Sequence, residues 1–154
     1  MKTYRLIRRQ KLPLTIHDCW DFFSDPDNLA TITPDWLNFE VCSQIPQEIY
    51  AGLIIEYRVS PVMNVRLRWL TEITHANAPF YFVDEQRSGP YQLWHHQHLF
   101  EKTDSGTLMT DIVHYQLPLG IFGQWTQSVV AKKLQQIFDY REQTLRKLFP
   151  DDDT

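Results

Sequence analysis

The sequence contains few cysteines and no excess of positive charge, and both absences exclude whole classes of protein. Its 154 residues include only Cys19 and Cys42, whose spacing matches no metal-binding or redox motif. A disulfide-rich secreted scaffold is therefore excluded. Lys and Arg total 15 against 19 Asp and Glu, which gives a net charge of −4, and the basic residues are scattered. A nucleic-acid-binding surface is not expected from this distribution.

Long apolar runs are also missing. No run approaches the roughly 20 residues that span a bilayer, so we expect no integral membrane segment. The first nine residues alternate polar and apolar and lack the apolar core of a signal peptide. We therefore expect one cytoplasmic domain over residues 1–150, followed by an acidic tail at 151–154. Aromatic residues, in contrast, make up 14% of the chain, and such side chains line small-molecule pockets as well as fill cores.

The most informative stretch is residues 93–120, where two alternating runs flank a polar turn at residues 103–106. This pattern is typical of a β-hairpin. If the turn places Lys102 opposite Thr107, side chains of one parity share a single face, because they alternate along a strand. The cross-strand pairs on that face are Phe100–Met109, His98–Asp111, His96–Val113 and Trp94–Tyr115. The predicted inner face is therefore apolar and aromatic, with two histidines and an aspartate set into it.

The remaining elements follow from capping signals and periodicity. Residues 3–12 alternate as a first strand. Thr15 is a candidate N-cap for a helix that ends near Ser24, and Asp25 with Pro26 begins a second short helix. Further strands are predicted at residues 38–43, 53–59, 65–74 and 80–88.

Two of these strands can be paired from sequence. Matching Val59 with Val65 places Ile55 opposite Trp69 and Glu56 opposite Arg68. Residues 80–88 are less informative, because neither face of that strand is cleanly apolar.

A long helix is predicted over residues 121–149. Its buried stripe follows three- and four-residue steps, and the stripe consists of Val130, Leu134, Ile137, Phe138, Arg141, Leu145 and Leu148. An antiparallel meander has one face to bury, and this helix is the only element long enough to cover it. We therefore predict an α+β fold in which a curved antiparallel sheet of about seven strands wraps around the C-terminal helix, with two short helices after the first strand. A cavity is expected between the sheet and the helix.

This order of elements resembles the helix-grip superfamily, which includes START lipid-transfer domains, the birch-pollen allergen, plant hormone receptors and polyketide cyclases/dehydrases (the SRPBCC group). The resemblance covers essentially the whole chain. Several segments are similar to a bacterial branch described as ligand-binding SRPBCC proteins: Val-Asp-Glu-Gln at 83–86, Ser-Gly-Pro-Tyr at 88–91, Trp-His-His-Gln-His-Leu-Phe at 94–100, and Gly106, Thr107, Asp111, Val113, Tyr115 and Pro118. In the plant hormone receptors the turns that match residues 60–64 and 88–91 act as gate and latch, whereas a rigid turn is the alternative for both.

The candidate site residues are those on the predicted inner faces. His98 and Asp111 are a candidate acid–base pair, because a carboxylate fixes the tautomer of an imidazole and raises its basicity. A buried hydrogen-bonded pair that only orders the hairpin is the alternative. Arg141 interrupts the apolar stripe and either faces an anionic group of a ligand or packs its stem with its charge at the rim. The candidate ligand-binding residues are Trp69, Phe82, Gln86, Trp94, His96, His98, Phe100, Asp111, Tyr115 and Arg141.

A metal site is a further possibility on the same face. His96, His98 and Asp111 form a two-histidine, one-carboxylate set there, but no fourth ligand is evident. We therefore expect no metal and no cofactor. His95 and His114 face each other on the outer surface, where they are either solvated or a contact in a homodimer.

Three functions are compatible with these features. The leading one is binding or transport of a small hydrophobic or amphipathic molecule, since the sequence has an aromatic inner face and no unambiguous nucleophile or cofactor motif. The second is an enzyme of the cyclase/dehydratase type that uses His98 and Asp111. The third is a partner-binding module that acts through the apolar segment at residues 117–125 and has no ligand of its own.

Overall fold

The computed structural model describes residues 2–60, 65–118 and 123–151, although the side chains of residues 123–125 lie outside the description. Seven strands form one sheet in the order β1-β7-β6-β5-β4-β3-β2, with antiparallel pairing between every pair of neighbours. The elements are β1 Tyr4–Leu12, α1 Ile16–Phe23, α2 Pro26–Thr31, the 3-10 helix η1 Asp35–Leu37, β2 Glu40–Val41, β3 Leu53–Val59, β4 Leu67–Asn77, β5 Tyr81–Ser88, β6 Leu93–Thr103, β7 Gly106–Gln116 and α3 Gly123–Leu148.

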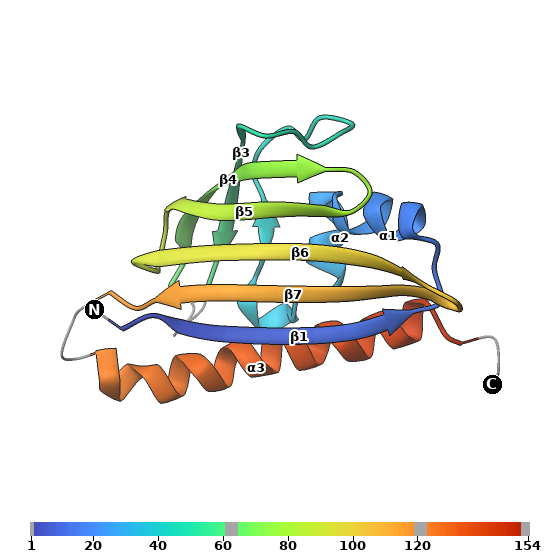
Figure 1. Cartoon of the computed structure of the whole chain (residues 1–154). Coiled ribbons are helices and arrows are strands. Elements are labelled where there is room, and N and C mark those ends of the chain that lie inside the picture. The colour runs from blue at the N-terminus through green and yellow to red at the C-terminus, as the bar shows by residue number, and fades with distance from the viewer. Residues whose placement is uncertain (1, 61–64, 119–122, 152–154) are drawn as a thin grey trace.

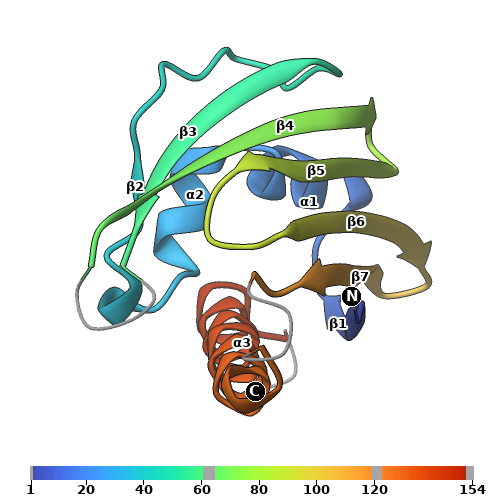
Figure 2. The same ribbon diagram turned by 90° about the vertical axis from the view of Figure 1, so that its left-hand side faces the viewer.

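The sheet curves around α3. Figure 1 shows α3 running alongside β1 over the length of the sheet, and Figure 2, viewed almost along α3, shows the sheet curling from β1 round to β3. The two short helices α1 and α2 lie near one end of the sheet (Figure 1). The helix-grip architecture predicted from the sequence is confirmed.

Local capping explains where the two short helices begin. Thr15 accepts a hydrogen bond from the backbone N–H of Asp18 at 3.1 Å, which satisfies one of the free donors at the start of α1. Asp25 does the same for Asp27 in α2 at 2.9 Å, with Pro26 at the first helical position. Both predicted N-caps are confirmed.

The β6–β7 hairpin has the register that its turn implies. Lys102 lies opposite Thr107, and His98 lies opposite Asp111. The outer-face pair His95 and His114 is also opposed, with ring centroids 6.1 Å apart.

The β3–β4 pairing differs from the prediction by two residues. Val59 lies opposite Leu67 rather than Val65, and Ile55 lies opposite Thr71 rather than Trp69. A slip of two keeps each side chain on its face, because the side-chain period of a strand is two. Arg68 still reaches Glu56 as a diagonal neighbour, with Nε 2.9 Å from Oε1.

Two apolar clusters hold α3 against the sheet. Leu134 and Phe138 pack in one of them, and Leu145 packs in the other, around Leu12 and Cys19. The predicted stripe is wrong at its end, where Leu148 is 44% exposed. Four residues beyond Leu145 the helical step falls on Phe149 instead, and its ring packs edge-on to Phe22 at 5.1 Å.

Candidate functional site

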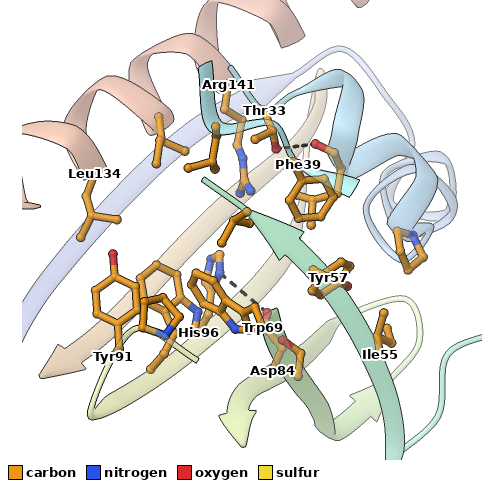
Figure 3. Close-up of a pocket in the computed structure, with 18 of the residues that line it drawn as sticks. Thr33, Phe39, Ile55, Tyr57, Trp69, Asp84, Tyr91, His96, Leu134 and Arg141 are labelled. Carbon is orange, nitrogen blue, oxygen red and sulfur yellow. Dashed lines mark hydrogen bonds and ion pairs between the residues drawn. The ribbon is translucent and has the colours of Figure 1, made fainter. Parts of the chain in front are cut away.

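A cavity of about 520 Å³ lies between the concave face of the sheet and α3. Its walls are mainly apolar and aromatic and come from α1, α2, the strands β3 to β6, and α3. Figure 3 shows Leu134 and Arg141 on the helix side of the cavity, and Tyr57, Trp69, Asp84 and His96 on the sheet side. Pockets that bind small molecules commonly have this size and this mixture of apolar walls with a few polar groups.

The polar groups form one cluster, because neighbouring strands bring them into register. Asp84 on β5 lies opposite His96 on β6, and His98 on β6 lies opposite Asp111 on β7. Arg141 completes the cluster from α3 and is buried. Four elements therefore each contribute at least one charged or ionisable side chain to this part of the molecule.

Two short hydrogen bonds connect the histidines to the carboxylates. His96 donates from Nε2 to Asp111 Oδ1 at 2.7 Å, and His98 donates from Nε2 to Asp84 Oδ2 at 2.7 Å. Arg141 Nη1 lies 3.3 Å from both oxygens of Asp111. Among the two histidines, Asp111 is therefore hydrogen-bonded to its diagonal neighbour His96 and not to His98, which lies directly opposite on β6.

The two imidazole rings lie face to face between the carboxylates. Their centroids are 3.7 Å apart, and Phe82 stacks on His98 at 4.1 Å. The remaining nitrogen of each ring faces the other carboxylate. His98 Nδ1 is 3.2 Å from Asp111 Oδ1 without hydrogen-bond geometry, and His96 Nδ1 is 3.7 Å from Asp84 Oδ2.

Charges within the cluster balance one another. Burial opposes ionisation of Asp111, but Arg141 and the two imidazoles outweigh it and hold its pKa well below the usual range. The pKa of Asp84 is also lowered, because the histidines and Arg141 outweigh the effect of burial. At neutral pH both carboxylates are therefore ionised.

The pKa values of the two histidines shift in opposite directions. Burial and the adjacent charge of His98 lower the pKa of His96. Burial also acts to lower the pKa of His98, but the two carboxylates outweigh it and raise that pKa above its usual value. The raised pKa of His98 favours its protonated form. In that form His98 and Arg141 offset the charges of the two carboxylates, as buried charges require.

Some buried nitrogens of this region have no hydrogen-bond partner among the residues that the structure describes. They include Trp69 Nε1, His98 Nδ1 and Arg141 Nε, all on side chains of cavity-lining residues. Buried polar atoms are nearly always paired in folded proteins, so unpaired ones call for an explanation.

The predicted site residues divide into two groups. The side chains that line the cavity are Trp69, Phe82, Trp94, His96, His98 and Arg141. Asp111 lies behind the histidines and is 1% exposed. The others outside the lining are Gln86, Phe100 and Tyr115.

Each of those three side chains has a structural contact. Gln86 exchanges hydrogen bonds with the backbone of Tyr91 at 2.7 and 3.1 Å and so braces the turn between β5 and β6. Phe100 packs against Trp20 and Phe23. Tyr115 stacks on Tyr4 at 5.4 Å.

Asp84 and Tyr91 are among the lining residues that were not selected from the sequence. Asp84 lines the cavity, and the available signal was its alternation with Phe82 on one face of residues 80–88. Tyr91 also lines it and packs between Trp69 and Trp94, with centroid distances of 5.5 and 4.8 Å. Its turn position gave no periodicity from which to predict its direction.

The predicted gate and partner segments are only partly described. The turn at residues 88–91 contributes Pro90 and Tyr91 to the cavity wall. Residues 61–64 of the other turn lie outside the described residues, as do residues 119–122 of the segment 117–125. Leu117 and Pro118, which precede that gap, line the cavity. Within the described ranges, no helix is long and apolar enough to cross a membrane.

Comparison with known proteins shows similarity at the level of fold alone. No family model matches the sequence, and no curated protein matches it either. Among solved structures, TTHA0849 from Thermus thermophilus is similar with a TM-score of 0.69 and 19% identity, covering 95% of both chains. Protein CV1439 from Chromobacterium violaceum is similar with a TM-score of 0.71 and 14% identity, covering 99% of this chain and 100% of the other. The major latex-like protein 151 from Panax ginseng has a TM-score of 0.67 and 10% identity, covering 97% and 99%. These similarities establish the helix-grip fold.

Proposed function

We propose that this protein binds a small amphipathic molecule in the cavity between the sheet and α3. The observation that carries the proposal is the combination, in one cavity of about 520 Å³, of aromatic and aliphatic walls with a single buried polar cluster. Apolar walls favour burial of a hydrophobic body. A localised polar cluster fixes the orientation of one polar end.

The unpaired nitrogens support the same proposal. Trp69 Nε1 and Arg141 Nε are N–H donors on residues that line the cavity, and neither has a hydrogen-bond partner among the described residues. A carbonyl, hydroxyl or carboxylate oxygen of a ligand would satisfy such donors after a small side-chain shift, since ligands often tighten contacts that are open in the free protein. The segments at 83–86, 88–91 and 94–100, which resemble the bacterial ligand-binding SRPBCC branch, agree with this proposal.

The enzymatic alternative has less support. A general base must reach the proton that it removes, directly or through one water. Asp111 is 1% exposed, does not line the cavity and is occupied by His96 and Arg141. The sequence-based hypothesis pairs His98, which lines the cavity, with Asp111 as the group that raises its basicity. In the structure Asp111 is hydrogen-bonded to His96 and Arg141, and His98 Nε2 is hydrogen-bonded to Asp84, so His98 and Asp111 share no hydrogen bond.

The test uses N-phenyl-1-naphthylamine, a neutral probe whose fluorescence rises in apolar surroundings, together with native mass spectrometry. Two adjacent valines on α3 provide a matched pair, since Val130 lines the cavity whereas Val129 is 54% exposed. We expect one probe molecule per chain, loss of binding in Val130→Trp, and retention in Val129→Trp. Circular dichroism checks folding, and Ile137→Trp replaces Val130→Trp if that variant does not fold. Absence of probe binding, or equal binding by both folded variants, would overturn the proposal.

A further inference from the structure

Three potential metal ligands meet on the sheet side of the cavity. Asp84, His96 and His98 each offer one donor atom, and these atoms all lie within 4.8 Å of one another. Asp84 Oδ2 is 2.7 Å from His98 Nε2 and 3.7 Å from His96 Nδ1. All three residues line the cavity.

We propose that Asp84, His96 and His98 bind a divalent first-row transition-metal ion whose remaining coordination positions face the cavity. Two imidazole nitrogens and one carboxylate oxygen form a donor set that binds Zn²⁺, Fe²⁺ or Co²⁺. The carboxylate comes from β5, so the set differs from the combination of His96, His98 and Asp111 considered from the sequence.

Asp111 has the position of a supporting group on the opposite side of the rings. Metal-bound histidines usually donate their second ring N–H to a carboxylate, which fixes the tautomer and the ring orientation. His96 donates from Nε2 to Asp111 at 2.7 Å, and this bond leaves Nδ1, on the Asp84 side, with its lone pair free. Asp111 is held in turn by Arg141, with Nη1 3.3 Å from each oxygen.

His98 has the same relationship to the two carboxylates. Its Nε2 faces Asp84, and its Nδ1 lies 3.2 Å from Asp111 Oδ1, without a hydrogen-bond partner among the described residues. A metal ion on Nε2 would place the ring proton on Nδ1, where a small rotation completes a hydrogen bond to Asp111. The unpaired buried nitrogen of His98 would then have a partner.

The spacing is close to what an ion requires. Metal–ligand distances of about 2.0–2.2 Å imply that neighbouring donor atoms lie roughly 3 Å apart. The observed 2.7 and 3.7 Å fall on either side of that value, and the third separation, between the imidazole nitrogens of His96 and His98, is at most 4.8 Å. Binding of an ion would therefore require small movements of Asp84 and of the two rings. With both histidines neutral, the two carboxylates and Arg141 leave one negative charge. A divalent ion turns this into one positive charge, which favours an anionic or strongly polar group of a molecule in the cavity.

The proposal does not depend on a cavity ligand and is tested with the metal alone. Untagged protein is stripped with a chelator that is then removed, and it is titrated with Zn²⁺ by calorimetry and with Co²⁺ by visible absorption. His95 and His114 on the outer face are a competing histidine pair, so a His95→Ala/His114→Ala variant serves as the control background. We expect one ion per chain in both the natural sequence and this background, and a visible Co²⁺ spectrum typical of nitrogen and oxygen ligands.

Asp84→Asn removes the proposed carboxylate ligand at almost constant volume. Substitution of a residue that only hydrogen-bonds to a metal ligand lowers metal affinity by about 10- to 100-fold, and loss of a direct ligand is expected to cost at least that much. If Asp84→Asn does not fold, Zn²⁺-induced shifts of the imidazole nitrogen resonances of His96 and His98 in the control background decide the question. The proposal is overturned by absence of binding, by loss of binding in the outer-face variant, by unchanged affinity in folded Asp84→Asn, or by Zn²⁺ leaving those resonances unshifted.

Discussion

At the scale of single residues, the Asp111–Arg141 pair connects the sheet to the C-terminal helix. Both side chains are buried, and Arg141 Nη1 lies 3.3 Å from both carboxylate oxygens. The guanidinium carbon also lies 4.9 Å from the centre of the Phe138 ring. A buried pair of this kind adds little to stability over an apolar pair of the same shape, but loss of one partner leaves a buried charge uncompensated.

Arg141→Met keeps the aliphatic stem and removes the charge, so we expect the free energy of unfolding to fall by about 3–5 kcal/mol. Arg8→Met is the matched control, because Arg8 pairs with Asp139 at 2.7 Å with side chains 28% and 53% exposed. That exposed pair is expected to contribute only about 0–1 kcal/mol. Urea denaturation measures both variants. Adding Asp111→Asn to Arg141→Met should restore part of the loss, and equal losses for the two single variants would contradict this account.

Much of the polar cluster was predictable at this scale, but its hydrogen bonds were not. The hairpin register placed His96, His98 and Asp111 on one face, because a short turn fixes the alignment of the two strands. Asp84 was not singled out, since both faces of residues 80–88 mix polar and apolar side chains. The exchange of partners, with Asp111 bonded to His96 and Asp84 to His98, depends on rotamers that a register does not determine.

At the scale of elements, the β6–β7 turn is constrained by a close contact with the end of β1. Gly106 has φ of +138°, and a Cβ at this position would lie 2.1 Å from the backbone oxygen of Leu12. Gly52 also has a positive φ, of +97°, but a Cβ there would meet nothing within 4 Å. An alanine at position 52 would therefore suffer only backbone strain, whereas an alanine at position 106 would also clash with Leu12.

Gly106→Ala is expected to destabilise the protein by more than Gly52→Ala. Strain at an unfavourable φ costs about 1–3 kcal/mol at either position, and only Gly106→Ala adds a clash with backbone that cannot move without disturbing the β1–β7 pairing. Chemical denaturation of the two variants, followed by far-ultraviolet circular dichroism, measures the difference. Equal destabilisation of the two variants would contradict this account, because it would show that the backbone at Leu12 shifts away from the new Cβ without a measurable cost in stability.

The elements also show why some boundaries were predictable. The β6–β7 register was right because its turn has a strong local signal. The β3–β4 register was displaced by two because residues 60–66 contain no comparable signal and β4 begins at Leu67, not Val65. The predicted buried stripe of α3 was correct as far as Leu145 but wrong at Leu148. The helical period allows the next buried position to be three or four residues after Leu145, and the sequence did not decide between Leu148 and Phe149.

At the scale of the whole molecule, the ionised cluster predicts how stability depends on pH in the metal-free protein. Asp84 and Asp111 have lowered pKa values, so their contribution is present above the unfolded value of 3.8 and is lost as the pH falls through the folded values. His96, whose pKa is also lowered, adds to the loss on acidification, because the unfolded chain binds its proton more readily. His98 has the opposite sign, since its raised pKa stabilises the fold below 6.5 and that contribution is lost as the pH rises.

We therefore expect the free energy of unfolding to fall steeply as the pH is lowered. Near pH 4, unfolding should take up about one to two protons, so the free energy of unfolding should fall by about 1.4–2.8 kcal/mol for each unit of pH. Urea denaturation between about pH 6 and pH 3 with a chelator present measures this slope. Asp111→Asn, which removes one of the titrating groups, should flatten it. A stability that stays constant over this range would mean that the carboxylates titrate alike in the folded and unfolded chains.

The overall architecture was predictable because the order of strands and helices leaves one way to bury a long apolar stripe. The size of the cavity was not, because it depends on how far the sheet curves and on which rotamers fill the concave face. Asp84 and Tyr91 illustrate this limit, since each lines the cavity only because of the local course of β5 and its turn.

The pairing of β1 with β7 has a consequence for how the chain assembles. β1 precedes the other described elements in the chain, yet its only neighbour in the described sheet is β7, and Tyr4 pairs with Tyr115 more than a hundred positions later. During synthesis β1 therefore lacks its strand partner until β7 has emerged from the ribosome. The charge of Asp111 is then without its partner Arg141 until α3 has also been synthesised. Topologies dominated by such distant contacts fold slowly. β1 can therefore join the sheet only after β7 has been synthesised.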